Sequence, residues 1–132
     1  MRELNELTGM IIASAIDIHR ALGPGLLESV YQRVLVAALR QKGLDVQSQI
    51  PVQFVYGDIQ FDDGLRLDLL VEGRVIVELK SIEQVSAIHK KQVLTYLHLT
   101  NAPVALLINF GQARLKDGIY RLINNRDYWR DC

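Results

Sequence analysis

The chain has almost no cysteine, and its opening residues do not have the pattern of a secretory signal or a membrane span. Its single cysteine, Cys132, is the last of 132 residues, so one chain cannot form a disulfide framework or a cysteine-ligated zinc or iron–sulfur site. The opening segment MRELNELTGM lacks the basic leader of a secretory signal and the uninterrupted apolar stretch of a membrane span. We therefore expect a cytoplasmic protein that has no membrane partner.

An excess of charge of either sign is also absent. Lys plus Arg and Asp plus Glu both number 15, so the net charge is zero and gives no indication of binding to nucleic acid. The total charge does not, however, reveal local clusters of charge. The composition is 49% apolar and 23% charged, which is ordinary for a folded soluble protein. With no internal repeat, low-complexity tract or linker, residues 1–132 are expected to form one domain.

Apolar residues recur at helical spacing in three stretches. The first two, Leu7 to Leu22 and Leu26 to Gln41, are separated by Gly23-Pro24-Gly25 and are expected to be helices joined by a rigid corner. A third helix is expected from Ser86 to Thr100.

Short runs rich in Val, Ile, Phe and Tyr predict the strands. Four of them form an expected antiparallel meander: Val52 to Tyr56, Ile59 to Phe61, Leu65 to Val71 and Val75 to Leu79. Val104 to Phe110 is an apolar run typical of a central strand buried on both faces, and Ile119 to Ile123 adds a last short strand. No structure is predicted for residues 124–132. The order of elements predicts an α/β sandwich with a mixed sheet.

Residues 65–80 carry the pattern that points to chemistry. Folded as a hairpin with its turn at Glu72-Gly73-Arg74, this segment places Asp68 opposite Glu78. Alternation then puts two sets on opposite faces: Leu67, Leu69, Val71, Val75, Val77 and Leu79 toward the core, and Arg66, Asp68, Leu70, Ile76, Glu78 and Lys80 on the other face.

The two facing carboxylates need a compensating charge. Like charges opposite each other destabilise a sheet by up to roughly 1 kcal/mol, and Lys80 on the same face would offset part of that repulsion. A divalent cation held by both Asp68 and Glu78 would offset more. The alternative is that these are solvated charges on the outer face of an edge hairpin.

The spacing of Asp68, nine residues, then Glu78-Leu79-Lys80 resembles motifs II and III of the PD-(D/E)XK nuclease superfamily. Within it, the segment from Gly25 to Tyr31 resembles the GxxExxY signature that names one family. The resemblance runs from Ile11 to Ile123 and includes LGPGLLESVY, DLLVEGRVIVELK, QVLTYL and LLINFG. It implies a restriction-endonuclease-like sandwich in which helices flank a mixed central sheet.

The resemblance also implies roles for individual residues. Asp68 and Glu78 would hold Mg²⁺ or Mn²⁺ with the Leu79 carbonyl as a further ligand, and Lys80 would position or help deprotonate the attacking water. Glu28 would be the acid of motif I and a further metal ligand, completing the acidic cluster. It shares a helix face with Tyr31 and Leu35, which suggests an inward carboxylate, while stabilisation of the helix start by an acid is the alternative.

Polar residues on two helices are further candidates. Gln92 and Tyr96 resemble the motif that follows the acid-x-Lys strand in RecB-like nucleases of the superfamily, and His89 lies on the same helix face. Some RecB-like members place a histidine ligand at the position of His19, for which a hydrogen-bonded histidine at a helix end is the alternative.

The expected function is metal-dependent hydrolysis of phosphodiester bonds in DNA, or in RNA. The alternative is a catalytically inactive nuclease-fold protein that binds nucleic acid or a protein partner. A homodimer or a subunit of a larger complex is compatible with both. A serine hydrolase is not supported, because the chain has no Gly-x-Ser-x-Gly segment, and phosphate-loop and dinucleotide glycine patterns are absent.

Overall fold

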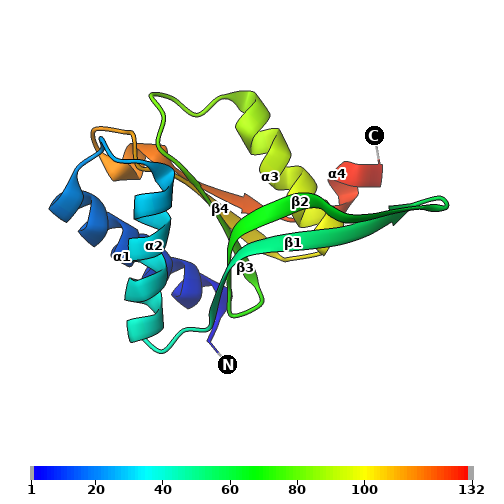
Figure 1. Cartoon of the computed structure of the whole chain (residues 1–132), viewed down its shortest axis with the longest axis horizontal. Helices are drawn as coiled ribbons and strands as arrows, with labels where there is room; N and C mark the ends of the chain where they lie inside the picture. Colours follow the sequence, from blue (N-terminus) through cyan, green and yellow to red (C-terminus); the bar gives the residue numbers. More distant parts are fainter. Residues whose placement is uncertain (1, 131–132) are drawn as a thin grey trace.

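The computed structural model describes residues 2–130, apart from the side chains of residues 126 and 128. Within them, helices pack on both faces of a five-stranded mixed sheet (Figure 1). The elements are α1 (Leu4–Leu22), α2 (Glu28–Gln41), β1 (Val46–Tyr56), β2 (Ile59–Val71), β3 (Val75–Lys80), α3 (Ala87–Thr100), β4 (Val104–Asn109), η1 (Leu115–Gly118), β5 (Ile119–Ile123) and α4 (Arg126–Arg130). The predicted α/β class with a mixed sheet is confirmed.

The strands lie in the order β1-β2-β3-β4-β5. β3 and β4 are parallel and are joined through α3, whereas the other neighbouring pairs are antiparallel. β4 lies between β3 and β5 and is buried along its whole length, as its apolar run predicted. The parallel pair brings the ends of β3 and β4 to the same edge, where Lys80 pairs with Asn109.

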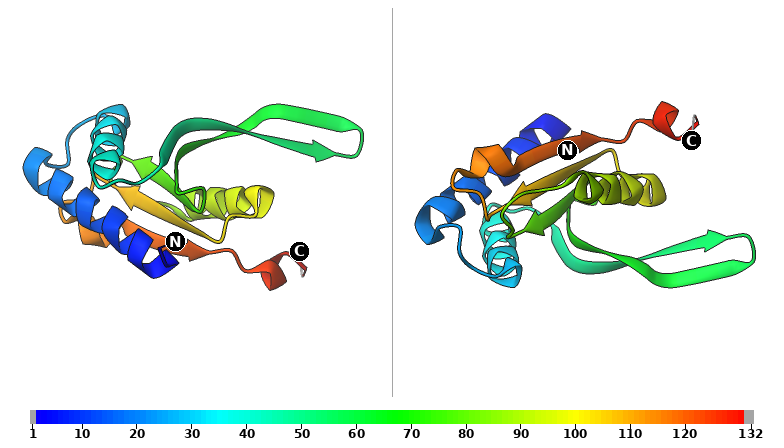
Figure 2. Two further views of the ribbon diagram at one scale, coloured as in Figure 1. Left: turned by 90° about the horizontal axis from the view of Figure 1, so that it is seen from below. Right: turned by 90° about the horizontal axis from the view of Figure 1, so that it is seen from above.

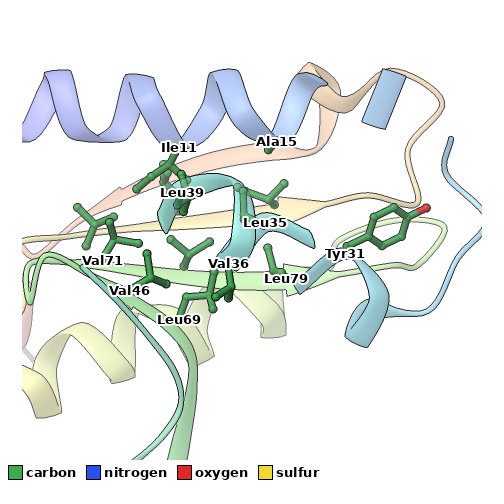
Figure 3. Close-up of a cluster of buried hydrophobic side chains, with 14 of the residues drawn as sticks. Ile11, Ala15, Tyr31, Leu35, Val36, Leu39, Val46, Leu69, Val71 and Leu79 are labelled. Atoms are coloured by element: carbon green, nitrogen blue, oxygen red, sulfur yellow. The ribbon is translucent and has the colours of Figure 1, made fainter. Parts of the chain in front are cut away.

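Two apolar clusters sandwich the sheet. The first lies under α1 and α2 and takes Val77 and Leu79 from β3; Figure 3 shows part of it. The second lies under α3 and takes Ile76 from β3 together with Val93 and Leu97 from the helix. Because side chains of a strand alternate between faces, consecutive residues of β3 serve opposite sides of the molecule.

The segment between α1 and α2 is held by a buried tyrosine. The Tyr31 hydroxyl donates a hydrogen bond to the Gly23 carbonyl and accepts one from the Leu26 amide at 3.1 Å. Gly23 has a φ of 78°, which favours glycine, and Leu27 is extended. The second helix therefore begins at Glu28, two residues later than the spacing predicted.

β1 and β2 extend beyond the sheet as a two-stranded arm (Figures 1 and 2). The predicted runs Ile59 to Phe61 and Leu65 to Val71 form one strand, although Gly64 lies between them. A Cβ at Gly64 would lie 2.6 Å from the Phe54 ring, which stacks on Phe61 at 4.8 Å between centroids. The glycine therefore makes room for a ring pair and does not break the strand.

The sequence pattern predicts no element for residues 124–132, and the structure adds a short helix there. Residues 126–130 form the short helix α4, and the rings of Trp129 and His98 stack at 4.3 Å between centroids. Residues 131 and 132 lie outside the described part. Among the described helices, none combines the length and hydropathy that a membrane span requires.

Candidate metal-binding site

The predicted hairpin register is confirmed near its turn. β2 pairs with β3 at Leu69–Val77, Leu70–Ile76 and Val71–Val75, around a turn in which Glu72 and Gly73 have positive φ. Beyond Leu69 the two strands separate, because β2 continues into the arm with β1 (Figure 1). Asp68 and Glu78 are the next residues of this register, so both lie at the fork where β2 leaves β3.

The two carboxylates close this fork with reciprocal hydrogen bonds. Glu78 Oε1 accepts the Asp68 amide at 3.0 Å, and Asp68 Oδ2 accepts the Leu79 amide at 2.9 Å. Each side chain thus bonds to the backbone of the opposite strand, in place of a ladder hydrogen bond. These contacts fix both carboxyl groups next to one another.

Burial gives the pair unusual electrostatics. Glu78 is only 6% exposed, and this burial, reinforced by the negative charge of Asp68, raises the pKa of Glu78 to about 8. A hydrogen bond between the two carboxyl groups acts in the same direction, since it requires a proton on one of them. Near neutral pH the metal-free pair therefore retains a proton.

Lys80 is half-buried and lies two residues beyond Glu78 on the same side of β3. Its positive charge lowers the pKa of Glu78, but it is the weakest of the influences on that group. Within the described residues it forms no ion pair with either acid. The compensation expected from Lys80 is therefore small, and in the described part of the chain no other positive charge compensates the acid pair.

The predicted face of Leu67 is wrong. Leu67 was expected beside Leu69 and Val71, but it packs in the cluster under α3 with Val93 and Leu97. Opposite the fork, Gln49 of β1 has a φ of 51°, which interrupts the ladder between β1 and β2. Two-stranded ribbons twist strongly. The twist turns Leu67 to the other face of the sheet as the arm departs.

Tyr96 of α3 faces the acid pair. It is half-buried, and its pKa is raised by burial and then by the negative charges of Glu78 and Asp68. Gln92 lies one helical turn earlier and is exposed. His89 serves the start of the helix, where its Nδ1 accepts the Ser86 amide at 3.0 Å. Of these three predicted residues, the structure links only Tyr96 to the acids by an interaction.

Glu28 is not brought to the pair. It is exposed, and the described residues contain no group of three or more acidic, histidine or cysteine side chains able to hold a metal. Tyr31 and Leu35 on the same helical face are fully buried, but Glu28 is the first residue of α2, and its side chain remains exposed among the described residues. The Ser81 hydroxyl does donate a hydrogen bond to the Leu26 carbonyl, which joins the approach to α2 to the residue after Lys80.

His19 is buried at the end of α1. Its Nε2 lies 2.8 Å from the Gln112 carbonyl oxygen, and its ring centroid lies 6.3 Å from that of Phe110. This contact corresponds to the alternative prediction, a hydrogen-bonded histidine at a helix end.

Asn109 is a structural support of the site to which the sequence reasoning gave no role. Fully buried at the end of β4, it accepts the Ile82 and Gly111 amides at 3.1 and 3.0 Å and donates to the Ile82 carbonyl at 2.9 Å. A Cβ at Gly111 would lie 2.1 Å from the Ile82 oxygen. The available clue was a polar residue at the end of a buried apolar strand, with a glycine two residues later. Asn109 fixes the chain just after Lys80.

The acid pair fits a divalent cation. It offers oxygen donors, which Mg²⁺ and Mn²⁺ prefer, and it carries a proton that a cation would replace. Mg²⁺ is usually bound through one or two carboxylates, with waters and substrate phosphates completing its shell. Two acids are therefore sufficient protein ligands.

Comparison with known families gives a match along most of the chain. A model of the PD-(D/E)XK nuclease superfamily matches residues 5–122. No curated protein and no solved structure matches the chain significantly.

Proposed function

Because the chain belongs to the PD-(D/E)XK nuclease superfamily, we propose that it is a divalent-metal-dependent nuclease that hydrolyses phosphodiester bonds in DNA, with RNA as the other possible polymer. One observation carries the proposal: Asp68 and Glu78 are interlocked at the fork of β2 and β3, with Lys80 on the same side of β3. The segment from Gly25 to Tyr31 supports assignment to the GxxExxY family.

Asp68 and Glu78 would hold Mg²⁺ or Mn²⁺. The Leu79 carbonyl is the proposed third ligand, because N–H and C=O groups of one strand residue point toward the same neighbour, and the Leu79 amide bonds to Asp68. A cation bound there would polarise the phosphate and lower the pKa of a water molecule. The reciprocal hydrogen bonds keep both carboxylates in place before any ligand arrives.

Lys80 is proposed to act on the reacting phosphate. Its ammonium group would offset negative charge on the phosphate oxygens as that charge grows in the transition state, and would orient the attacking water. The Tyr96 hydroxyl would donate a hydrogen bond to a phosphate oxygen from above the pair, and Gln92 would do so from one turn nearer the start of α3.

Glu28 and His19 are proposed as supporting residues. Through the Ser81–Leu26 hydrogen bond, the start of α2 adjoins the segment after Lys80, so Glu28 can bind a water or ligand at the edge of the site. His19 adjoins Phe110, whose amide bonds to the Lys80 carbonyl at 2.7 Å.

Cleavage assays test the proposal. Purified protein with Mg²⁺ or Mn²⁺ should cut at least one of double-stranded DNA, single-stranded DNA and RNA, and Lys80→Ala should lower the rate at least about 100-fold. Lys91→Ala, the same change on an exposed part of α3, is the matched control and should retain activity. Equal melting temperatures would show that both variants fold. Undiminished cleavage by Lys80→Ala would overturn its role.

A catalytically inactive binding protein is the second candidate, favoured by the position of Glu28 outside the acid pair. Calorimetric titration with Mn²⁺ at pH 8 to 9 separates the two. Binding that disappears in Asp68→Asn supports the nuclease. Absence of Mn²⁺ binding together with absence of cleavage supports the inactive form.

A further inference from the structure

A second candidate site lies on the α1 side of the edge at which β3 and β4 end. Here a hollow of about 350 Å³ is lined by the last turns of α1 and by residues 113–116. Its charged lining residues are Arg20, Arg114 and Lys116, with Ile16 and Leu115 as apolar walls. None of the described residues that line it is acidic.

The walls of this hollow are held together. His19, which also lines it, bonds through Nε2 to the Gln112 carbonyl at 2.8 Å and so ties α1 to the segment that carries Arg114. Leu115 is buried, and a Cβ at Gly118 would lie 2.7 Å from the backbone carbonyl oxygen of Asn109. The backbone that carries the cations is therefore fixed.

The cations of the hollow have no partner within the described residues. Arg20, Arg114 and Lys116 form no side-chain hydrogen bond, ion pair or ring contact there. Most other described cations do have partners: Arg40, Lys42, Arg66, Arg74 and Arg121 donate hydrogen bonds, Arg2 and Arg130 pair with acids, and Lys90 lies over the Tyr120 ring. Three unpaired positive charges around one concavity attract an anion.

The hollow adjoins the edge that carries Lys80. The Phe110 amide bonds to the Lys80 carbonyl, and from Phe110 the chain continues directly into the residues that line the hollow. The far end of the arm has the opposite character, since Asp58, Asp62 and Asp63 lie there without a basic residue between Phe54 and Leu65. A polyanion is therefore drawn to the hollow end of the molecule and repelled from the arm.

We infer that this hollow binds a backbone phosphate of the substrate strand, next to the phosphate held at Asp68, Glu78 and Lys80. The inference rests on the proposed function and adds to it a path for the strand, across the shared edge of β3 and β4 toward the end of α1. Arg114 and Lys116 bind the phosphate from one wall and Arg20 binds it from the other.

Salt-dependent binding tests the inference without cleavage. Fluorescence anisotropy with labelled single- and double-stranded DNA in EDTA gives the slope of log affinity against log salt concentration. Arg114→Glu should make the slope shallower by about 0.9 for each duplex phosphate contact removed, or about 0.7 for a single strand. With Mn²⁺, the same variant should raise KM and leave kcat nearly unchanged.

Arg33→Glu is the matched control, because it makes the same charge change at an exposed position of α2 outside the hollow. An equal change of slope in Arg33→Glu and Arg114→Glu, or no change in Arg114→Glu, would overturn the inference while wild-type cleavage still supported the nuclease. Calorimetry with inorganic phosphate is a second experiment. Binding as tight as that of an oligonucleotide would identify free phosphate as the ligand and overturn the assignment. A wild-type protein that neither binds nor cuts any polymer would defeat the proposed function and the inference together.

Discussion

On one face of β3, Val75, Val77 and Leu79 are buried under α1 and α2; on the other face, Ile76 and Glu78 are buried under α3. Leu79 and Glu78 are neighbours in the chain and are almost equally inaccessible, at 1% and 6% exposed. Burial of Leu79 stabilises the fold by roughly 1.5–3 kcal/mol. Burial of Glu78 opposes its ionisation and raises its pKa to about 8.

The difference shows that one strand supplies both a core and a reactive group. The apolar face anchors β3 against α1 and α2. The anchored backbone then holds Glu78 in a buried position and Lys80 in a half-buried one, where water screens their charges less. Reciprocal hydrogen bonds with Asp68 keep the carboxylates together despite their repulsion. Substitutions on the two faces should therefore have separable effects, on chemistry and on stability.

The largest expected effect is on activity. Asp68→Asn keeps an oxygen that can accept the Leu79 amide but removes a negative charge from the pair. Cleavage should fall at least about 100-fold, and Mn²⁺ affinity should fall with it, while the melting temperature stays the same or rises. Unchanged activity would remove Asp68 from the site.

Leu79→Ala should distinguish most clearly the role of the apolar face of β3 in stability from the role of the acid pair in metal binding. The substitution leaves a cavity under α1 and α2, so the free energy of unfolding should fall by about 2–5 kcal/mol in denaturant titrations. The Leu79 backbone remains, and Mn²⁺ binding by the folded fraction should persist. Loss of Mn²⁺ binding with little loss of stability would contradict the separation.

Asn109→Ala should weaken the support beneath Lys80. It removes three hydrogen bonds and leaves the Ile82 and Gly111 amides without this acceptor, so we expect a loss of about 1–3 kcal/mol in the free energy of unfolding. Asn109→Asp retains the acceptor oxygens but, when ionised, buries a negative charge against the Ile82 carbonyl, so it should recover part of the stability only at low pH, where the acid is protonated. No recovery at low pH would exclude the acceptor role.

The metal-free protein should lose stability as pH rises from about 5 to about 8. In this range the folded state holds a proton on Glu78 that the unfolded state releases, so the slope is negative, on the order of 1 kcal/mol per pH unit, and this contribution ends above pH 8. Glu78→Gln removes the titrating group and should flatten the profile. Identical profiles in urea titrations of the two proteins would contradict the buried acid.

The smallest effect is expected from Glu28→Gln. Glu28 is exposed and outside the pair, so cleavage should fall less than about tenfold, far less than in Asp68→Asn. A loss as large as that of Asp68→Asn would show that Glu28 moves to the acids when substrate or metal binds.

Much of the fold could be predicted from local pattern. Helical spacing located α1, α2 and α3 to within three residues, with glycines marking the corner between α1 and α2 and the end of α2. The turn at Gly73 fixed the register that places Asp68 opposite Glu78. Features that depend on how the elements pack against one another could not be predicted from local pattern. The twist of the arm moved Leu67 to the other face, and the absence of cover over the first turn of α2 left Glu28 exposed. The basic hollow joins residues distant in sequence, which no local spacing reveals.

Anomalous diffraction from crystals grown with Mn²⁺ above pH 8 tests the central claim most directly. A single manganese peak bonded to carboxylate oxygens of both Asp68 and Glu78, and absent in Asp68→Asn crystals, is the predicted result. A peak that contacts neither carboxylate, or an intact acid pair without manganese at saturating concentration, would contradict it.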